Sequence, residues 1–252
     1  MTGTTGRVAL VTGASSGIGA ATARLLAARG MRVVVNYLRN VTAADEVVAG
    51  IEAAGGQAMA VQADVREAAA VESMVKQVKA AWGGIDVLVH NALIPYVVKP
   101  FHDMTWNELG GKLDAEMRAA FAVTKAVLPA MTEQGWGRII YLGTGLSHHP
   151  REGMIALGTA KAALVQFARY LAQELGPRGI TVNVVEPGPV EDTRMAKNVL
   201  DEKHRQRQVA ATPMGRLAHP DDVAQAVAFY AGEDNAFMTG TTAAVNGGMS
   251  MY

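Results

Sequence analysis

Short apolar, β-branched runs alternate with longer Ala-rich segments along the 252-residue chain. The runs are short and bounded by turn residues, so they predict strands, at 8–12, 32–36, 58–62, 86–89, 137–142, 180–186 and 241–245. The segments between them are long enough for helices, as at 19–28, 43–54, 71–82, 106–131 and 154–175. Strands that are apolar throughout are buried on both faces, and long connections allow helical crossovers. The pattern predicts an α/β, Rossmann-type fold: a doubly wound, parallel, seven-stranded sheet with helices on both faces.

No internal repeat and no low-complexity linker divides the chain, so we expect a single domain over residues 1–252. The irregular stretch at 187–214 holds PGPVEDTRM followed by the polar run DEKHRQRQ. Because a strand follows it, we interpret this stretch as a mobile lid over a substrate site rather than as a domain boundary.

Charge and cysteine content narrow the classes of partner. The 23 Lys and Arg residues balance 23 Asp and Glu residues, so no net charge attracts nucleic acid or an anionic membrane. The absence of cysteine excludes disulfides and thiolate metal sites. The first residues, MTGTTGRVALVTG, resemble neither a secretory signal nor a membrane anchor. We therefore expect a cytoplasmic protein that acts on a small molecule, with neither nucleic acid nor membrane as a partner.

The segment TGASSGIG, residues 12–19, follows the first strand directly and opens the first helix. Glycines there allow a tight turn and close approach to a pyrophosphate, whose charge the helix N-terminus stabilises. The preceding strand and following helix supply the context that a Gly-rich turn needs to indicate dinucleotide binding. The candidate residues are Gly13, Ser15, Ser16, Gly17, Ile18 and Gly19.

The second strand ends in VVVNYLRN, beside the expected adenosine ribose. Asn36 carries no negative charge to repel a 2′-phosphate, and Arg39 offers donors, so we favour NADP(H) over NAD(H). The alternative for Arg39 is an ordinary solvated cation. Asp64 is placed to accept from an adenine amino group, although a turn or cap role is equally common for aspartate.

Several motifs together resemble the short-chain dehydrogenase/reductase family, especially its 3-oxoacyl-carrier-protein-reductase-like members. They are TGASSGIG, VQADV, DVLVHNA, GRIIYLGT, TAKAAL, GITVNVVEPGPV and TGTTAAVNGGM, and they cover nearly the whole chain. The resemblance implies a homotetramer or homodimer paired through the helices at 106–131 and 154–175. It also implies cofactor contacts at Val65, Asn91, Ala92, Lys161, Pro187, Gly188, Val190 and Thr193.

The family's four catalytic positions are only partly kept. Its Tyr, Lys, Ser and Asn positions correspond to Leu157, Lys161, Thr144 and Glu116. Leu157 cannot transfer a proton, so the usual acid is absent. Thr144 keeps a hydroxyl that can orient a substrate oxygen. Glu116 replaces an amide with an acid, which we expect to pair with Lys161.

Two further departures lie beside the same pocket. The family's NNAG is HNAL here, so Leu93 stands where glycine allows close approach of backbone and cofactor. The segment PGPVEDT has one more residue than the family pattern, which places Asp192 in the slot expected for Thr193. We expect dinucleotide binding with altered geometry near the nicotinamide, and a weaker affinity than in relatives with the full pattern.

Other side chains are candidates for the missing proton transfer. His148 and His149 follow Thr144 in the loop at the end of the strand, and histidine titrates near neutral pH. Tyr96, in the loop after the fourth strand, could bring a phenol to the nicotinamide. The alternatives are two solvated histidines and a packed aromatic ring.

Two more residues read as structural. Tyr141 lies an odd number of residues before Thr144 on the strand, so we expect it in the core. His90 has no carboxylate–histidine cluster of ligand spacing around it, so we predict hydrogen bonding within the sheet end and no metal site.

Three functions remain open from the sequence. The first is a noncanonical NADP(H)-dependent oxidoreductase that reduces a carbonyl or an imine without the usual Tyr acid. The second is a non-redox enzyme, a dehydratase, isomerase or cyclase, that uses Glu116 or a loop histidine. The third is a catalytically inactive dinucleotide-binding or regulatory subunit. A shared fold does not decide among them, because function depends on the site.

Overall fold

The computed structural model describes residues 5–193 and 202–251, and within them a seven-stranded, fully parallel sheet in the order β3-β2-β1-β4-β5-β6-β7. The strands are β1 (Val8–Val11), β2 (Arg32–Tyr37), β3 (Gln57–Gln62), β4 (Val87–His90), β5 (Gly137–Leu142), β6 (Ile180–Pro187) and β7 (Thr242–Val245). Every predicted strand is present, and its ends differ from the prediction by no more than one residue. The fold class is confirmed.

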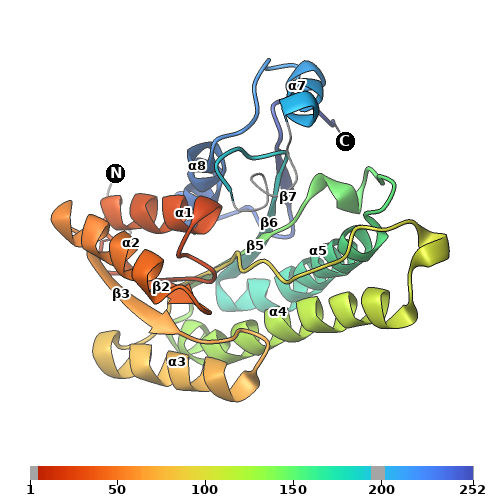
Figure 1. The fold of residues 1–252 in the computed structure, drawn as a ribbon. Helices are drawn as coiled ribbons and strands as arrows, with labels where there is room; N and C mark the ends of the chain where they lie inside the picture. The colour runs from red at the N-terminus through yellow and green to blue at the C-terminus, as the bar shows by residue number, and fades with distance from the viewer. Residues whose placement is uncertain (1–4, 194–201, 252) are drawn as a thin grey trace.

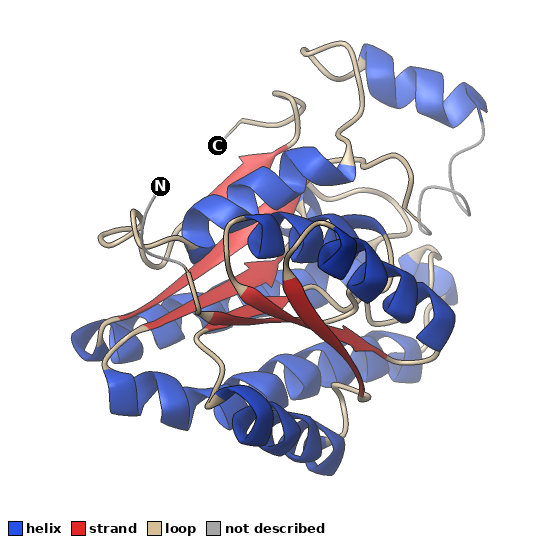
Figure 2. Ribbon diagram, turned by 90° about the vertical axis from the view of Figure 1, so that its left-hand side faces the viewer, coloured by secondary structure: helices blue, strands red, loops and turns tan. Residues whose placement is uncertain are grey.

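Helices cover both faces of the sheet. On one face lie α1 (Gly17–Ala28), α2 (Val41–Ala53) and α8 (Pro220–Ala231), and on the other lie α3 (Ala68–Trp82), α4 (Trp106–Gln134) and α5 (Ile155–Leu175). Figure 1 shows the two layers, and Figure 2 shows the twisted sheet between them. Each layer of helices packs on its own apolar cluster. Val33 and Val89 belong to the cluster under α1, α2 and α8, and Leu10 and Leu88 belong to the cluster under α3, α4 and α5.

Local signals fix the helix ends that position the site. Asn40 caps α2 by accepting from the Ala43 N–H at 3.1 Å. Thr105 and Glu108 form a capping box at the start of α4. Gly135, in the left-handed region, ends the same helix. Helix α4 begins at the predicted residue, whereas α2 begins two residues before its predicted start and α4 ends three residues beyond its predicted end, because caps rather than apolar periodicity determine these ends.

The irregular segment at 187–214 includes the short helix α7 (Glu202–Ala210), which has no buried residue and stands apart from the sheet in Figure 1. Residues 194–201 of the predicted lid lie outside the described residues. The lid therefore stays a prediction. None of the described helices combines the length and apolarity that a membrane span requires.

Candidate active site

The order of the strands reverses between β1 and β4, and the Gly-rich turn lies at this point. In an open parallel sheet, the carboxyl ends of the strands on either side of such a reversal form a ligand-binding crevice. Gly13 and Gly17 both have positive φ, at +64° and +54°. A Cβ at Gly13 would lie 2.8 Å from the Ala92 Cα atom, so the turn tolerates no side chain there.

Hydrogen bonds from the residues after β4 hold the Gly-rich turn in place. The Asn91 side chain donates to the carbonyls of Thr12 and Gly13, and the Ala92 N–H donates to the Thr12 hydroxyl at 3.0 Å. Ser16, at the N-cap of α1, makes no side-chain capping bond. The N–H groups in the first turn of α1 are therefore not capped by the Ser16 side chain. Such N–H groups, together with the helix dipole, favour the binding of a phosphate.

Asn36 and Arg39 have different surroundings at the end of β2. The Asn36 side chain is buried; it accepts from the Gly13 N–H at 3.2 Å and donates to the carbonyls of Val61 and Ala63. It thus supports the Gly-rich turn. Arg39 is exposed and makes no hydrogen bond or ion pair with the described residues, so its guanidinium is available to an anion.

Asp64, predicted to lie at the adenine, is engaged within the protein. Its carboxylate accepts a bidentate pair of hydrogen bonds from Arg66, including Nε at 2.9 Å, and these hydrogen bonds lower the pKa of Asp64. Val65 beside it is buried.

A cluster of three charged side chains is buried between α4 and α5, near the carboxyl ends of β4 and β5. Glu116 on α4 is fully buried, and its Oε1 lies 2.8 Å from Lys161 Nζ while its Oε2 lies 2.5 Å from Lys112 Nζ. Burial raises the pKa of the Glu116 carboxyl, but the charges of Lys161 and Lys112 outweigh it and hold the pKa at about 2. The expected pairing of Glu116 with Lys161 is confirmed.

Lys161 has a second fixed partner. Its Nζ donates to the carbonyl of Leu142, the last residue of β5, at 2.6 Å. The ammonium thus has one hydrogen bond and one ion pair within the protein, and with three protons it can also donate to a ligand. Leu157, one turn earlier on α5, is 5 % exposed and brings only an alkyl group to this position.

The Thr144 hydroxyl lies at the end of β5, where it accepts from the Leu146 N–H at 3.4 Å and begins the short 3₁₀ turn η2 (Gly145–Ser147). The oxygen keeps a proton to donate, as the prediction requires of an orienting group. Thr144 follows the end of β5 by two residues, and Lys161 is bonded to Leu142, the last residue of that strand.

The extra residue of PGPVEDT is absorbed at Asp192, whose φ of +56° lies in the left-handed region. The bulge places Thr193 against the Gly-rich turn: a Cβ at Gly17 would lie 3.5 Å from Thr193 Cγ2. Val190 pairs with Ala218 beside it, and Gly188 allows the chain to pass Asn246, since a Cβ would lie 2.9 Å from the Asn246 Cβ. Pro187, which ends β6, leads into this segment.

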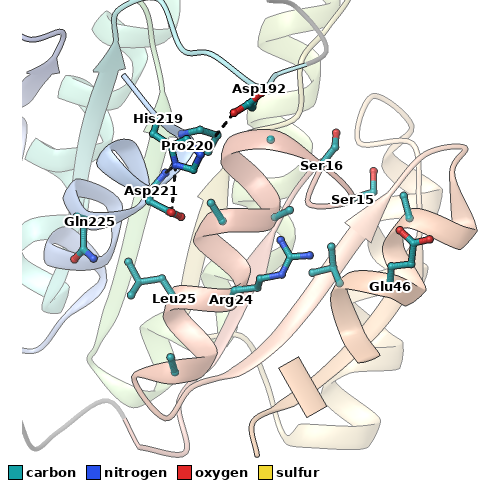
Figure 3. Close-up of a pocket in the computed structure, with 16 residues that line it drawn as sticks. Ser15, Ser16, Arg24, Leu25, Glu46, Asp192, His219, Pro220, Asp221 and Gln225 are labelled. Atoms are coloured by element: carbon teal, nitrogen blue, oxygen red, sulfur yellow. Dashed lines mark hydrogen bonds and ion pairs between the residues drawn. The ribbon is translucent and has the colours of Figure 1, made fainter. Parts of the chain in front are cut away.

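A groove on the outer side of α1 continues from Ser15 and Ser16 toward α8, and Figure 3 shows its lining. At one end, His219 lies between Asp192, at 3.8 Å, and Asp221, at 3.2 Å. Thr144, Leu157 and Lys161 are not among the residues that line this groove.

The other proposed proton carriers lie in different places. Tyr96 has its ring 5.8 Å from Lys112 Nζ, in a hollow shared with Arg66 and Glu108, and burial raises its pKa. His149 is exposed on the loop after η2. His148 lies 3.5 Å, measured from Nε2, from the buried carboxylate of Glu186.

The two residues expected to be structural gave one confirmation and one correction. Tyr141 is fully buried, bonded to the Thr124 hydroxyl at 2.6 Å, as predicted. The predicted hydrogen bonding of His90 is wrong: both ring nitrogens are buried without a partner, and the ring packs edge-on against Tyr141. Burial lowers the pKa of His90 to about 4, so the imidazole is neutral and tolerates this site.

Sequence reasoning missed Lys112 and Glu186. Lys112 precedes Glu116 by one helical turn, and this spacing was the available signal. Glu186 is an acid at the end of an otherwise apolar strand, GITVNVVEPG, which also marks an unusual buried charge. No group of three possible metal ligands comes together within residues 5–193 and 202–251.

Comparisons with known proteins agree with this geometry. Residues 13–250 match the family model described as enoyl-(acyl carrier protein) reductase. The chain is 42 % identical to a 3-oxoacyl-[acyl-carrier-protein] reductase of Synechocystis sp. over the full length of both, and 38 % identical to that of Escherichia coli over 98 % of each. A Serratia marcescens short-chain dehydrogenase/reductase variant superimposes with a TM-score of 0.90 at 34 % identity, covering 98 % of this chain and 99 % of the other. The chain belongs to the short-chain dehydrogenase/reductase family of oxidoreductases.

Proposed function

We propose that this protein is an NADP(H)-dependent reductase of a carbonyl or imine that works without the tyrosine acid of its family. The observation that carries the proposal is the fixed ammonium of Lys161 beside a leucine: Lys161 is held by Leu142 and Glu116, while Leu157 takes the position one turn before it. The cofactor-holding half of the catalytic pair is kept, and the proton-donating half is lost.

The chain's own groups fit a dinucleotide. The Gly13 and Gly17 conformations and the uncapped start of α1 suit a pyrophosphate. The ammonium of Lys161 suits a ribose hydroxyl, and the free guanidinium of Arg39 suits a 2′-phosphate. When bound, a reduced nicotinamide supplies a hydride.

The substrate class follows from the chemistry that remains. The Thr144 hydroxyl can donate to a substrate oxygen and polarise it for hydride addition. The relatives' name, 3-oxoacyl-[acyl-carrier-protein] reductase, describes reduction of the ketone at carbon 3 of an acyl chain, which supports a carbonyl substrate here. An already protonated imine would need no acid, and so it is the second member of the proposed class.

The non-redox alternative loses its main candidate residue. Glu116 is fully buried and shared by two ammonium groups, and its pKa of about 2 leaves it without a proton to give at neutral pH. An inactive dinucleotide-binding subunit is the alternative that the following experiment separates.

The test is to titrate the protein with NADPH by fluorescence and then to follow NADPH absorbance with ethyl acetoacetate and 2-methyl-1-pyrroline as probes. Binding followed by oxidation supports the proposal, whereas binding without oxidation of either probe supports the inactive subunit. Leu157→Tyr is expected to raise ketone reduction, since it restores a phenol as proton donor one helical turn before Lys161. Ile155→Tyr, on the same helix but 37 % exposed, is the matched control and should leave the rate unchanged.

A further inference from the structure

The carboxylate of Glu186 is buried at the carboxyl end of β6, next to the end of β5. Its side chain is 0 % exposed. A buried carboxylate is costly unless a charged or hydrogen-bonding partner compensates it. Neighbouring groups must therefore compensate the Glu186 carboxylate at the end of this otherwise apolar strand.

Space for Glu186 comes from a glycine on the neighbouring strand end. A Cβ at Gly143 would lie 2.9 Å from the Glu186 Cγ, 3.3 Å from its Oε1 and 2.8 Å from the Val184 Cγ1. Any larger residue at 143 would collide with the acid. The absence of a side chain at Gly143, the residue before Thr144, therefore leaves the space that the Glu186 side chain occupies.

His148 is the partner that this carboxylate meets. Its Nε2 lies 3.5 Å from Glu186 Oε1, and its side chain remains 29 % exposed. The loop is fixed on both sides, because the N–H groups of His148 and His149 both donate to the Gly145 carbonyl, at 3.1 and 2.9 Å. The imidazole is thus paired on one side with a buried acid while it keeps access to solvent protons.

The loop that carries His148 also packs on α5 at the residue after Leu157, which takes the position of the family's tyrosine. A Cβ at Gly158, the residue after Leu157, would lie 3.0 Å from the Leu146 carbonyl oxygen, so the turn carrying His148 packs directly on this part of α5. Thr144 and His148 therefore flank the turn η2, and this turn packs on α5 at Gly158, the residue after Leu157.

We propose that Glu186 positions His148 as the proton donor that replaces the tyrosine. The inference rests on the proposed reductase function. A hydride adds to the carbonyl carbon, the C=O π electrons move to oxygen, and the oxygen takes a proton from the His148 imidazolium. The nicotinamide is oxidised and the substrate reduced to an alcohol, and solvent returns a proton to the neutral imidazole. Because an imidazolium carries a proton on both nitrogens, one can be held against Glu186 while the other is transferred.

Other charged and titratable residues lie on the elements next to His148. Lys161 is on α5, and His149, Arg151 and Glu152 are on the loop of His148 itself, with Arg151 directed to the Met249 sulfur at 3.5 Å. Glu152 is exposed, whereas Glu186 is buried and lies 3.5 Å from His148. Loss of Glu186 should therefore affect His148 more strongly than loss of any of the others.

The kinetic test compares His148→Gln, Glu186→Gln, their double variant and the control His149→Gln, with NADPH and ethyl acetoacetate. We expect kcat to fall by about 10²–10⁴-fold in His148→Gln, and the double variant to be no slower than His148→Gln alone. The pH dependence of kcat should change in His148→Gln and stay as in the wild type in His149→Gln.

With 2-methyl-1-pyrroline, which is protonated in solution, the loss of kcat in His148→Gln should be below tenfold. Wild-type rates in both single variants would overturn the inference while leaving the reductase function intact.

A second measurement does not depend on turnover. The ¹⁵N chemical shifts of the His148 ring should show a proton on Nε2 in the wild-type protein and a mixture of tautomers in Glu186→Gln. Identical tautomer populations in the two proteins would show that Glu186 does not position His148, whatever the activity. A wild-type protein that oxidises no NADPH with either probe would contradict the proposed function and, with it, the proton transfer.

Discussion

The ammonium of Lys161 lies 2.8 Å from the carboxylate of Glu116, and the same carboxylate also holds Lys112 at 2.5 Å. Two buried cations thus share one buried anion. Their mutual repulsion makes the anion indispensable, because its removal would leave two close ammonium groups in an apolar interior.

Glu116→Gln is therefore expected to lower the free energy of unfolding at pH 7 by about 3–5 kcal/mol. The matched control is Asp114→Asn on the same helix, where an exposed pair with Arg118 should contribute no more than about 0.5 kcal/mol. Urea unfolding of the two variants measures the difference. A cost in Glu116→Gln as small as that of the control would show that the cluster does not stabilise the fold.

The same carboxylate predicts a pH dependence. Its pKa is about 2 in the folded protein against a usual 4.5, so the folded state binds fewer protons between these values. The stabilisation is complete above pH 4.5 and is lost as the pH falls toward 2. The unfolding free energy of Glu116→Gln should therefore vary less with pH in this window, and a slope equal to that of the wild type would contradict the assignment.

His90 gives a separate pH dependence at a higher range. Its folded pKa is about 4 against a usual 6.5, so the unfolded chain takes up the proton first on acidification. Stability should fall by roughly 3 kcal/mol from this group between pH 6.5 and 4. His90→Phe should remove that slope, whereas His102→Phe, at an exposed site, should keep it. Equal slopes in the two variants would refute the prediction.

The preference for NADP(H) is predicted to depend on Arg39. Because its guanidinium is exposed and uncommitted, Arg39→Ala should weaken NADPH binding roughly tenfold and leave NADH binding nearly unchanged. Arg24→Ala, in the groove over α1, is the control that should change neither. Isothermal titration with both dinucleotides measures the four affinities, and a loss for NADPH in Arg24→Ala instead would place the 2′-phosphate in that groove.

Assembly is expected through α4 and α5, where Phe121 and Tyr170 are 57 % and 64 % exposed. Sedimentation should find a homotetramer or homodimer at micromolar concentration. Phe121→Glu combined with Tyr170→Glu should shift it toward smaller species, because the substitutions bury charge at the interface. Phe101→Glu, exposed on the separate turn η1 (Phe101–Asp103), is the control. A wild-type monomer would contradict the expectation.

The sequence predicted the fold closely, because strands buried on both faces read as continuous apolar runs such as VALV and RVVVNY. It also predicted the Gly-rich turn and the Glu116–Lys161 pair, since a motif and a helical register position them. It did not predict that Asn36 would face inward to hold Gly13, because that depends on the register of β2 against β3. The backbone path of PGPVEDT could not be predicted from the sequence either. Asp192 adopts a left-handed conformation just before Thr193, which lies against Gly17.

Lys112 and Glu186 were missed for a common reason. Both are charged residues that a one-dimensional pattern assigns to solvent or to a helix face, and only packing shows that they are buried. His90 illustrates the converse error. A polar side chain at a sheet end was expected to find a hydrogen bond, whereas burial keeps the imidazole neutral and neither ring nitrogen has a hydrogen-bond partner among the described residues.

The central claim is that hydride transfer survives the replacement of tyrosine by Leu157. Its most direct measurement is the oxidation of NADPH by the wild-type protein with ethyl acetoacetate, followed by absorbance together with chromatography of the alcohol. The account predicts equimolar loss of NADPH and gain of alcohol, at a rate that Leu157→Tyr increases. NADPH that binds but is oxidised by neither protein would contradict it.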